Sequence, residues 1–374
     1  MKFLIIALMD FTLILFLFFG AAVFIQLLYF LMIYRKLAFH KESQGEFMSP
    51  VSVVVCGYNE AENWKRLIPL LLDQEYARFE IVVVNDQSTD NTKFVFKEWD
   101  WHPKLKVVTI DKYVKKGLGK KFALTLGIKA ARYDHLLLTD ADCYPKDKQW
   151  ISSMVQYFCN QKEIVLGYGS YEKHSGILNK LIRFDTFQVA LQYLSYALIG
   201  QSYMGVGRNL AYKKSLFFDN KGFASHIHIP SGDDDLFIRD VANSKNVAIA
   251  IHRSSQTFSE AKTTWSSWIR QKTRHLSTSG HYSLLHKFLL GFWAFSQLMF
   301  WALGIVLIAL ETNQEEVVLL MSLRLLIQGF IYFRVMKSLE ERDLIWLFPL
   351  YEIAQLFFQL IFVFSNLFNR QTRW

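Results

Sequence analysis

The sequence predicts an α/β domain with a mainly parallel mixed sheet, flanked by N- and C-terminal transmembrane helices. Two observations support this prediction. In the middle of the chain, strands made of continuous apolar residues alternate with helices, which is typical of a parallel sheet covered on both faces. Near both ends lie apolar runs long enough to cross a membrane, and 52% of the 374 residues are hydrophobic, with 33 Phe and 10 Trp.

The first element is the apolar run FTLILFLFFGAAVFIQLLYFLMI at 11–33. At about 1.5 Å per residue, a helix of this length crosses a hydrocarbon core of ~30 Å. A cleaved signal peptide is the alternative, but its apolar region would be shorter and followed by small residues, whereas Arg35 and Lys36 follow here. We therefore expect residues 1–36 to be a retained anchor. The basic residues after the span place the next domain in the cytoplasm by the positive-inside rule.

Charge and cysteine content narrow the class of protein. The formal net charge is +9, and the surplus lies mostly near the membrane-proximal segments, where anionic lipid headgroups account for it without nucleic acid. The cysteines, Cys56, Cys143 and Cys159, have no CxxC spacing, which suits a reducing compartment. We expect membrane lipids and no nucleic acid as partners, and neither a cysteine metal cluster nor a thiol nucleophile.

The middle of the chain alternates strands and helices. Strands are expected at 51–56, 80–85, 105–110 and 135–139, and helices at 60–72, 93–99 and 120–132. Ligands of open α/β sheets bind outside the carboxyl ends of the strands, where Asp86, Asp140 and Asp142 fall. The first strand is not followed by GxGxxG, and the sequence has no P-loop, so dinucleotide and Walker-type sites are excluded.

Long apolar segments follow residue 164. A helix is expected at 177–199, and because it is apolar most of the way round, it either packs deeply or lies on the membrane surface; we favour the surface. Residues 286–374 are expected to form a membrane region, with spans at 288–310 and 317–335. A full third span at 344–367 would place the basic tail outside, so we expect a re-entrant or interfacial segment there.

Two carboxylates end the fourth strand, in HLLLTDADCYP. Side chains at i and i+2 of an extended chain point the same way, so Asp140 and Asp142 require a positive partner. Together with Asp86 they suit a divalent cation, Mg²⁺ or Mn²⁺, that also binds substrate phosphates. The alternative is that the pair caps a turn before Pro145.

Four blocks extend this interpretation. They are VSVVVCGYNEAENW, EIVVVNDQSTDNT, GKKFALTLGIKAA and LLLTDADCYP, and in this order and spacing they resemble the family 2 glycosyltransferases, which transfer a sugar from a nucleotide-diphosphate donor with inversion. The resemblance continues through GVGRNLAY, SGDDDLF and RQKTRH, with membrane segments arranged as in the ceramide glucosyltransferase and polysaccharide synthase branches. It implies a cytosolic GT-A type nucleotide-sugar-binding domain at 49–282, with interfacial helices.

The resemblance also implies a donor site. The residues expected to contact the donor are Asn59, Glu60, Asp86, Lys120, Asp140, Gln271 and Arg274. Asp140 and Asp142 match the metal-binding D-x-D motif. Lys120 would add a positive contact at a helix start, with a solvated lysine as the alternative. Arg274 would bind the diphosphate, with an arginine at the membrane interface as the alternative.

The same resemblance suggests a catalytic base. Sugar transfer to a hydroxyl requires removal of its proton, and GDDD offers Asp233, Asp234 and Asp235. Asp234 matches the base of the family, although any of the three could instead be part of the acidic first turn of a helix. On the acceptor side we expect Asn209 and His275. QKTRH departs from the QxxRW element of the family at His275, which leaves the acceptor role of that residue open.

The predicted protein is a membrane-bound, metal-dependent inverting glycosyltransferase in glycolipid or cell-envelope glycan synthesis. It would move a sugar from a nucleotide-diphosphate sugar, with a UDP-sugar the expected donor, to a lipid or lipid-linked glycan acceptor at the cytoplasmic face of a bacterial inner membrane. A processive polysaccharide synthase is the first alternative, against which the three or four available spans count. The second is an inactive scaffold or a transporter, for which the sequence shows no internal repeat.

Overall fold

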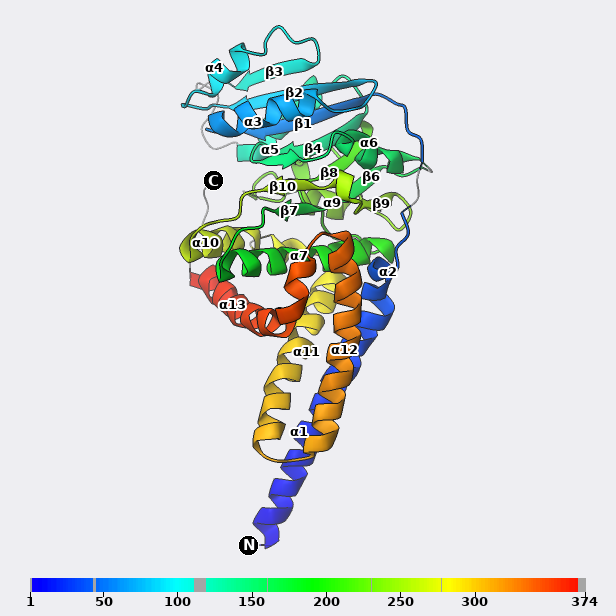
Figure 1. Ribbon diagram of the computed structural model, residues 1–374, viewed down its shortest axis with the longest axis vertical. Helices are drawn as coiled ribbons and strands as arrows, with labels where there is room; N and C mark the ends of the chain where they lie inside the picture. Colours follow the sequence, from blue (N-terminus) through cyan, green and yellow to red (C-terminus); the bar gives the residue numbers. More distant parts are fainter. Residues whose placement is uncertain are drawn as a thin grey trace.

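The α/β part of the chain stands at one end of a stem of long helices, with a layer of further helices between them (Figure 1). The structure is a computed structural model and describes residues 2–42, 45–110, 119–159, 161–229, 231–276 and 278–368. The sheet lies at the end of the molecule away from the stem, and the N-terminus lies at the tip of the stem.

Seven strands form one mixed sheet in the order β3-β2-β1-β4-β8-β6-β9. Their bounds are Val51–Gly57 (β1), Phe79–Asp86 (β2), Leu105–Ile110 (β3), His135–Asp140 (β4), Ile164–Gly167 (β6), Leu210–Lys213 (β8) and Val247–Ala250 (β9). All neighbours are parallel except β8, which runs antiparallel to both β4 and β6. The predicted mainly parallel mixed sheet is therefore confirmed.

Helices cover both faces of this sheet. Those of the α/β part are Ala61–Leu72 (α3), Thr92–Lys97 (α4), Gly119–Ala130 (α5), Trp150–Val155 (α6), Lys214–Asp219 (α8) and Asp235–Val241 (α9). The helix α5 lies unusually close to the strands, because a Cβ on Gly127 would come within 2.8 Å of the side chains of Val54 and Val84. A glycine is needed there for packing, since atoms in a close-packed core have no room to shift.

A second, three-stranded sheet in the order β5-β10-β7 lies between the main sheet and the helix layer (Figure 1). It is formed by Cys143–Pro145 (β5), Gly169–Tyr171 (β7) and Thr257–Ser259 (β10). Because β5 begins three residues after β4 ends, this small sheet fixes the direction of the chain immediately after Asp140.

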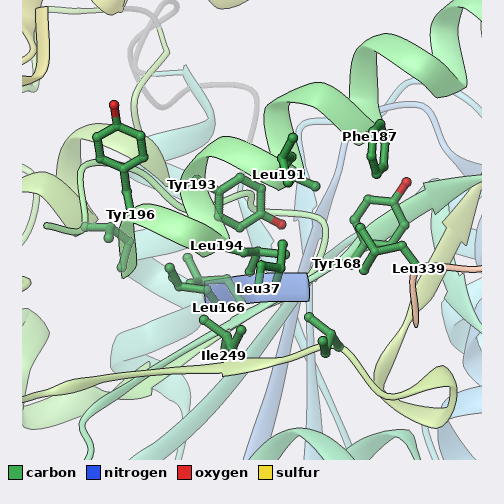
Figure 2. Close-up of a cluster of buried hydrophobic side chains, with 14 of the residues drawn as sticks. Leu37, Leu166, Tyr168, Phe187, Leu191, Tyr193, Leu194, Tyr196, Ile249 and Leu339 are labelled. Carbon is green, nitrogen blue, oxygen red and sulfur yellow. The ribbon is translucent and has the colours of Figure 1, made fainter. Parts of the chain in front are cut away.

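The long helix α7 (Ile177–Leu198) packs inside the protein, so our expectation of a position on the membrane surface is wrong. Figure 2 shows its side chains gathered with Leu166 of β6 and Ile249 of β9. Two of its charged residues are buried in ion pairs: Arg183 pairs with Glu341, and Asp185 pairs with a lysine of α10. The other face of α7 meets the stem helices, where Gln188 accepts a hydrogen bond from Tyr332.

Three helices form the stem. They are α1 (Lys2–Leu28), continued by η1 (Tyr29–Tyr34) and α2 (Arg35–Ala38), then α11 (Leu284–Ala309) and α12 (Gln314–Ser338). Among the described residues, four segments are long and apolar enough to cross a membrane, namely Phe11–Ala38, Leu284–Ala309, Gln314–Ser338 and Arg342–Phe362. Large apolar side chains on the stem are exposed, as expected for helices that face lipid, and include Phe18, Phe288 and Leu326.

The last helix, α13 (Phe348–Phe368), runs across the top of the stem instead of alongside α11 and α12 (Figure 1). A buried ion pair holds it there: Nη2 of Arg324 in α12 lies 2.7 Å from Oε1 of Glu352 in α13. Gln26 of α1 accepts a hydrogen bond from the same guanidinium group, and Gln297 of α11 donates one to Glu352. Four helices are thus joined through one polar cluster, whose pairing offsets the burial of two charges.

The helix layer joins the stem to the α/β part. The helix α10 (Trp265–Leu276) packs on α13, with the ring centroids of Trp268 and Phe358 5.0 Å apart and those of Trp268 and Phe362 5.5 Å apart. The predicted donor-side residues Gln271 and Arg274 lie on α10. Their placement therefore depends on the packing of α10 against α13.

Candidate active site

The acidic residues expected at the strand ends lie at one edge of the sheet. Strand β1 is parallel to β2 on one side and to β4 on the other, and Cys56 of β1 is in register with Asp140. Asp86 ends β2 and is half-buried, and burial raises the pKa of its carboxyl. The parallel register therefore places Asp86 and Asp140 on opposite sides of the end of β1.

The loops after β1 and β2 are joined to each other. Asn59 has a φ of 58°, a left-handed conformation that asparagine tolerates, and its Oδ1 accepts a hydrogen bond of 2.7 Å from the backbone N–H of Thr89. Asp90 accepts one of 3.0 Å from the N–H of Ala61 at the start of α3. Asp90 was not among the predicted site residues, because its partner Ala61 lies 29 positions earlier in the chain.

The D-x-D residues lie close enough to share a cation. Asp140 is half-buried and Asp142 exposed, and ligand atoms of Asp140, Asp142 and Cys143 all lie within 4.8 Å of one another. Burial and the neighbouring Asp142 raise the pKa of the Cys143 thiol, which donates a hydrogen bond to Asp142. The two carboxylates fit Mg²⁺ or Mn²⁺, which bind oxygen, and the protonated Cys143 thiol lies beside them.

Lys120 joins the D-x-D segment to the GDDD segment. Its Nζ lies 2.7 Å from Oδ1 of Asp140 and 2.9 Å from Oδ2 of Asp233. Burial alone would lower the pKa of Lys120, but Asp140, Asp233 and Asp234 together raise it well above its usual value. Lys120 is therefore not the solvent-exposed lysine that was the alternative interpretation of the sequence.

The adjacent Lys121 is also buried, and its ammonium group donates to the backbone carbonyls of His226, at 2.6 Å, and Ile229, at 3.0 Å. Burial lowers the pKa of Lys121 to about 8. This lysine therefore anchors the loop that leads into GDDD and is not a solvated neighbour of Lys120.

The three consecutive aspartates have three different environments. Asp233 pairs with Lys120, which holds the pKa of its carboxyl below the usual value although burial acts in the opposite direction. Asp235 accepts hydrogen bonds from the hydroxyl groups of Thr278 and Tyr282 and thus anchors the segment that precedes α11. Asp235 fits the alternative of a residue in the first turn of the helix, since α9 begins there.

Asp234 lies between these two and lines a small pocket together with Lys120, Asp140 and Gly207. Its Oδ2 accepts a hydrogen bond of 2.7 Å from the N–H of Gly207, and its Oδ1 one of 2.8 Å from the N–H of Asp235. Burial and the charges of Asp233 and Asp235 raise the pKa of Asp234 to about 7. A pKa near 7 suits proton removal near neutral pH.

Asn209 does not have the environment expected of an acceptor contact. The side chain is fully buried, and its Nδ2 donates to the carbonyls of Tyr168, at 2.9 Å, and Ser255, at 2.7 Å. Its Oδ1 accepts a hydrogen bond from the indole of Trp150. These bonds hold β8 to the neighbouring segments, so the geometry gives Asn209 a structural role instead.

The helix α10 brings Gln271, Arg274 and His275 to the layer below the pocket. Gln271 lies within hydrogen-bond distance of the hydroxyl of Tyr171, at 3.4 Å, and His275 is exposed. The guanidinium group of Arg208 stacks 4.5 Å from the Tyr171 ring. Arg208 was not among the predicted site residues, although it lies directly before Asn209 in GVGRNLAY.

Comparisons with known proteins agree with this architecture. The family model described as Glycosyl transferase family 2 matches residues 52–218. A poly-beta-1,6-N-acetyl-D-glucosamine synthase of Staphylococcus epidermidis is 29% identical over 141 residues, 37% of this chain and 33% of the relative. The probable glycosyltransferase YdaM of Bacillus subtilis is 25% identical over 64% of this chain and 57% of its own length. The match thus spans about a third of the first relative and little more than half of the second.

A solved structure supports the fold. The mannosyltransferase PcManGT from Pyrobaculum calidifontis, in complex with GDP-Man and Mn²⁺, superposes with a TM-score of 0.59 over 96% of this chain and 99% of its own. At 17% identity this likeness concerns the fold alone, and it extends through the α/β part and the stem.

Proposed function

Because residues 52–218 belong to glycosyltransferase family 2, we propose that the protein transfers a sugar from a nucleotide-diphosphate sugar to a lipid or lipid-linked glycan acceptor. One observation above all supports this proposal. Asp140 and Asp234, from segments far apart in the sequence, line one pocket with Lys120 between them, at the carboxyl ends of parallel strands. That edge is where open α/β sheets bind ligands.

The donor side of the site would hold the nucleotide and its diphosphate. Asn59, Glu60 and Asp86 lie on the loops at the strand ends and would contact the nucleoside, while the cations Lys120 and Arg274 would contact the diphosphate. Positive charge placed in advance at the departing group stabilises the charge that develops there.

A divalent cation, Mg²⁺ or Mn²⁺, would be held by Asp140 and Asp142. When bound, it would neutralise part of the negative charge on the donor diphosphate. The spacing of the two carboxylates supports this assignment, and the solved structure of similar fold contains Mn²⁺ with a nucleotide sugar. Lys120 pairs with Asp140 and with Asp233 and would stay close to the cation and the diphosphate.

Asp234 would act as the base. In its ionised form it would take the proton of the acceptor hydroxyl while that oxygen attacks the anomeric carbon of the sugar. The bond from the anomeric carbon to the diphosphate oxygen would break on the opposite face, which inverts the configuration. Hydrogen bonds from Gly207 and Asp235 hold both carboxylate oxygens of Asp234 in place for this step.

The acceptor would approach from the membrane. The α10–α13 layer that carries Gln271, Arg274 and His275 lies between the stem and the sheet (Figure 1), so a lipid-linked hydroxyl would reach the pocket along this layer. The basic residues Arg35 and Lys36 at the domain end of the first span support a cytoplasmic position of the site, by the positive-inside rule. The bacterial relatives support a location in a bacterial inner membrane.

A processive polysaccharide synthase is a second candidate, favoured by the relative named poly-beta-1,6-N-acetyl-D-glucosamine synthase. Membranes containing the protein, incubated with a panel of radiolabelled nucleotide sugars and then extracted with organic solvent, distinguish the two. The proposal predicts label in the lipid phase with one sugar per acceptor. Long polymer in the aqueous phase would favour the synthase, and labelling unchanged by Asp234→Asn would reject both.

A further inference from the structure

We propose that a basic pocket at the domain end of the stem binds the phosphate headgroup of an anionic phospholipid. The pocket is lined by Arg35, Lys36 and Phe39, at the junction between α2 and the linker that follows it. It shares no residue with the acidic pocket at the sheet edge. This inference therefore does not depend on the proposed sugar transfer.

A third cation, Arg334, lies beside this pocket and contacts Phe39, one of the residues that line it. Nε of Arg334 in α12 donates a hydrogen bond of 2.8 Å to the carbonyl of Ala38 at the end of α2, and its guanidinium carbon lies 4.5 Å from the Phe39 ring. An arginine has five N–H donors, and this bond uses one of them. The guanidinium group is thus held in one orientation with donors remaining for an anion, which reduces the entropy lost on binding.

The three cations have no acidic salt-bridge partner among the residues that the structure describes. Within the described ranges, none of Arg35, Lys36 and Arg334 forms a salt bridge, whereas the deeper cations Arg183 and Arg324 are both paired. Arg35, Lys36 and Arg334 are exposed. Their charges are therefore available to an external anion.

Apolar side chains lie directly below these cations, on the side of the stem. Each cation follows an exposed apolar residue by four positions, with Leu31 before Arg35, Met32 before Lys36 and Phe330 before Arg334. The exposed fractions of Leu31, Met32 and Phe330 are 45%, 62% and 55%. The Phe330 ring also contacts that of Phe39, with centroids 6.1 Å apart.

This arrangement of charge above apolar surface matches a lipid better than a free phosphate ion. Residues four apart lie on the same face of a helix, so each cation stands about one turn above an apolar neighbour. A free phosphate would contact only the cations. An anionic phospholipid would contact both the cations, through its headgroup, and the apolar side chains below them, through its acyl chains. We therefore assign the pocket to a lipid and not to a soluble anion.

The test compares lipid retention by full-length variants. The protein in detergent is incubated with equal amounts of phosphatidylglycerol and phosphatidylcholine, and bound lipid is counted by native mass spectrometry. We expect the wild type to retain phosphatidylglycerol preferentially. Arg334→Gln should reduce that preference about fivefold, and Arg35→Gln with Lys36→Gln should reduce it by roughly 20-fold. The double change has the larger effect because each basic residue near an anionic lipid contributes a similar amount to the binding free energy.

A double variant with the same change of charge serves as the control. Arg270→Gln with Lys287→Gln removes two exposed cations that do not line this pocket, and its lipid preference should equal that of the wild type. An equal loss of preference for phosphatidylglycerol in the pocket double variant and the control double variant would overturn the proposal, because the basic residues would then act only through the total charge of the protein. Displacement of the lipid by millimolar inorganic phosphate would overturn the choice of a lipid. Should the pocket double fail to fold, Arg334→Gln decides the question alone.

Discussion

The ammonium nitrogen of Lys120 lies 2.7 Å from Oδ1 of Asp140, and this pair joins the helix after β3 to the end of β4. Both side chains line the pocket that contains Asp234. A positive charge at this position stabilises the ionised form of the neighbouring carboxyls. It keeps the pKa of Asp234 lower than the pKa that burial alone would produce.

Replacing Lys120 tests this charge balance. Lys120→Met keeps most of the side-chain volume but leaves Asp140 and Asp233 without their partner, so we expect a loss of roughly 3 kcal/mol in the free energy of unfolding. Chemical denaturation in detergent measures it. Lys129→Met, on the exposed side of the same helix, should change stability by less than about 0.5 kcal/mol. Equal stability of the two variants would show that the pair contributes little.

Asp142→Asn tests the cation site. Asp142 is exposed and forms no salt bridge within the described residues, so its loss should leave folding intact while weakening Mn²⁺ binding by about 100-fold. Calorimetric titration with Mn²⁺ in the presence of a nucleoside diphosphate measures the affinity. Asp147→Asn, a nearby exposed aspartate, is the control. Unchanged Mn²⁺ affinity in Asp142→Asn would support the alternative that Asp140 and Asp142 only cap a turn.

The pH dependence of transfer should follow the pKa of Asp234. This carboxyl must be ionised to accept a proton, and its pKa is raised to about 7 by burial and by Asp233 and Asp235. We therefore expect kcat/KM to be low below pH 6, to rise through about pH 7 and to level off above it. Asp235→Asn removes one of the charges that raise this pKa and should move the midpoint to lower pH. A midpoint near pH 4 in the wild type would contradict the assignment.

The buried pair Arg324–Glu352 should stabilise the stem and the position of α13. Arg324→Met leaves Glu352 uncompensated among apolar helices, so we expect a loss of about 3–5 kcal/mol and a lower Tm in detergent. Adding Glu352→Gln should restore a large part of that loss, because the neutral amide can bond to Gln297 and Gln328. If the double variant were no more stable than the single one, the ion pair would not be the source of the effect.

The parts of the fold that the sequence predicts well are those with a strong periodic pattern. The parallel strands β1, β2 and β4 consist mainly of apolar residues, and β1 and β2 are each followed directly by a helix, so local pattern and tertiary environment agree. The helix α7 shows where this fails. A helix that is apolar all round can lie on a membrane surface or be buried inside a protein. Only tertiary contacts, such as that of Arg183 with Glu341, distinguish these two positions.

The residues of the candidate site also fall into those that the sequence predicts and those that it does not. Asp140, Asp142 and Asp234 belong to motifs whose position at a strand or helix end can be inferred from the sequence. The roles of Lys121, Arg208 and Asn209 depend on partners distant in the chain, such as His226, Tyr171 and Ser255. No spacing rule indicates which of two adjacent lysines is buried against a backbone carbonyl, because that depends on where the loop at 224–229 is folded.

The central claim is that Asp234 removes the proton of the acceptor hydroxyl. The most direct test is Asp234→Asn, measured by donor binding and by single-turnover transfer in the same preparation. We predict that affinity for the nucleotide sugar stays within about threefold of the wild type while transfer falls by roughly 10³-fold. Transfer at the wild-type rate, or a parallel loss of donor binding and transfer, would contradict the claim.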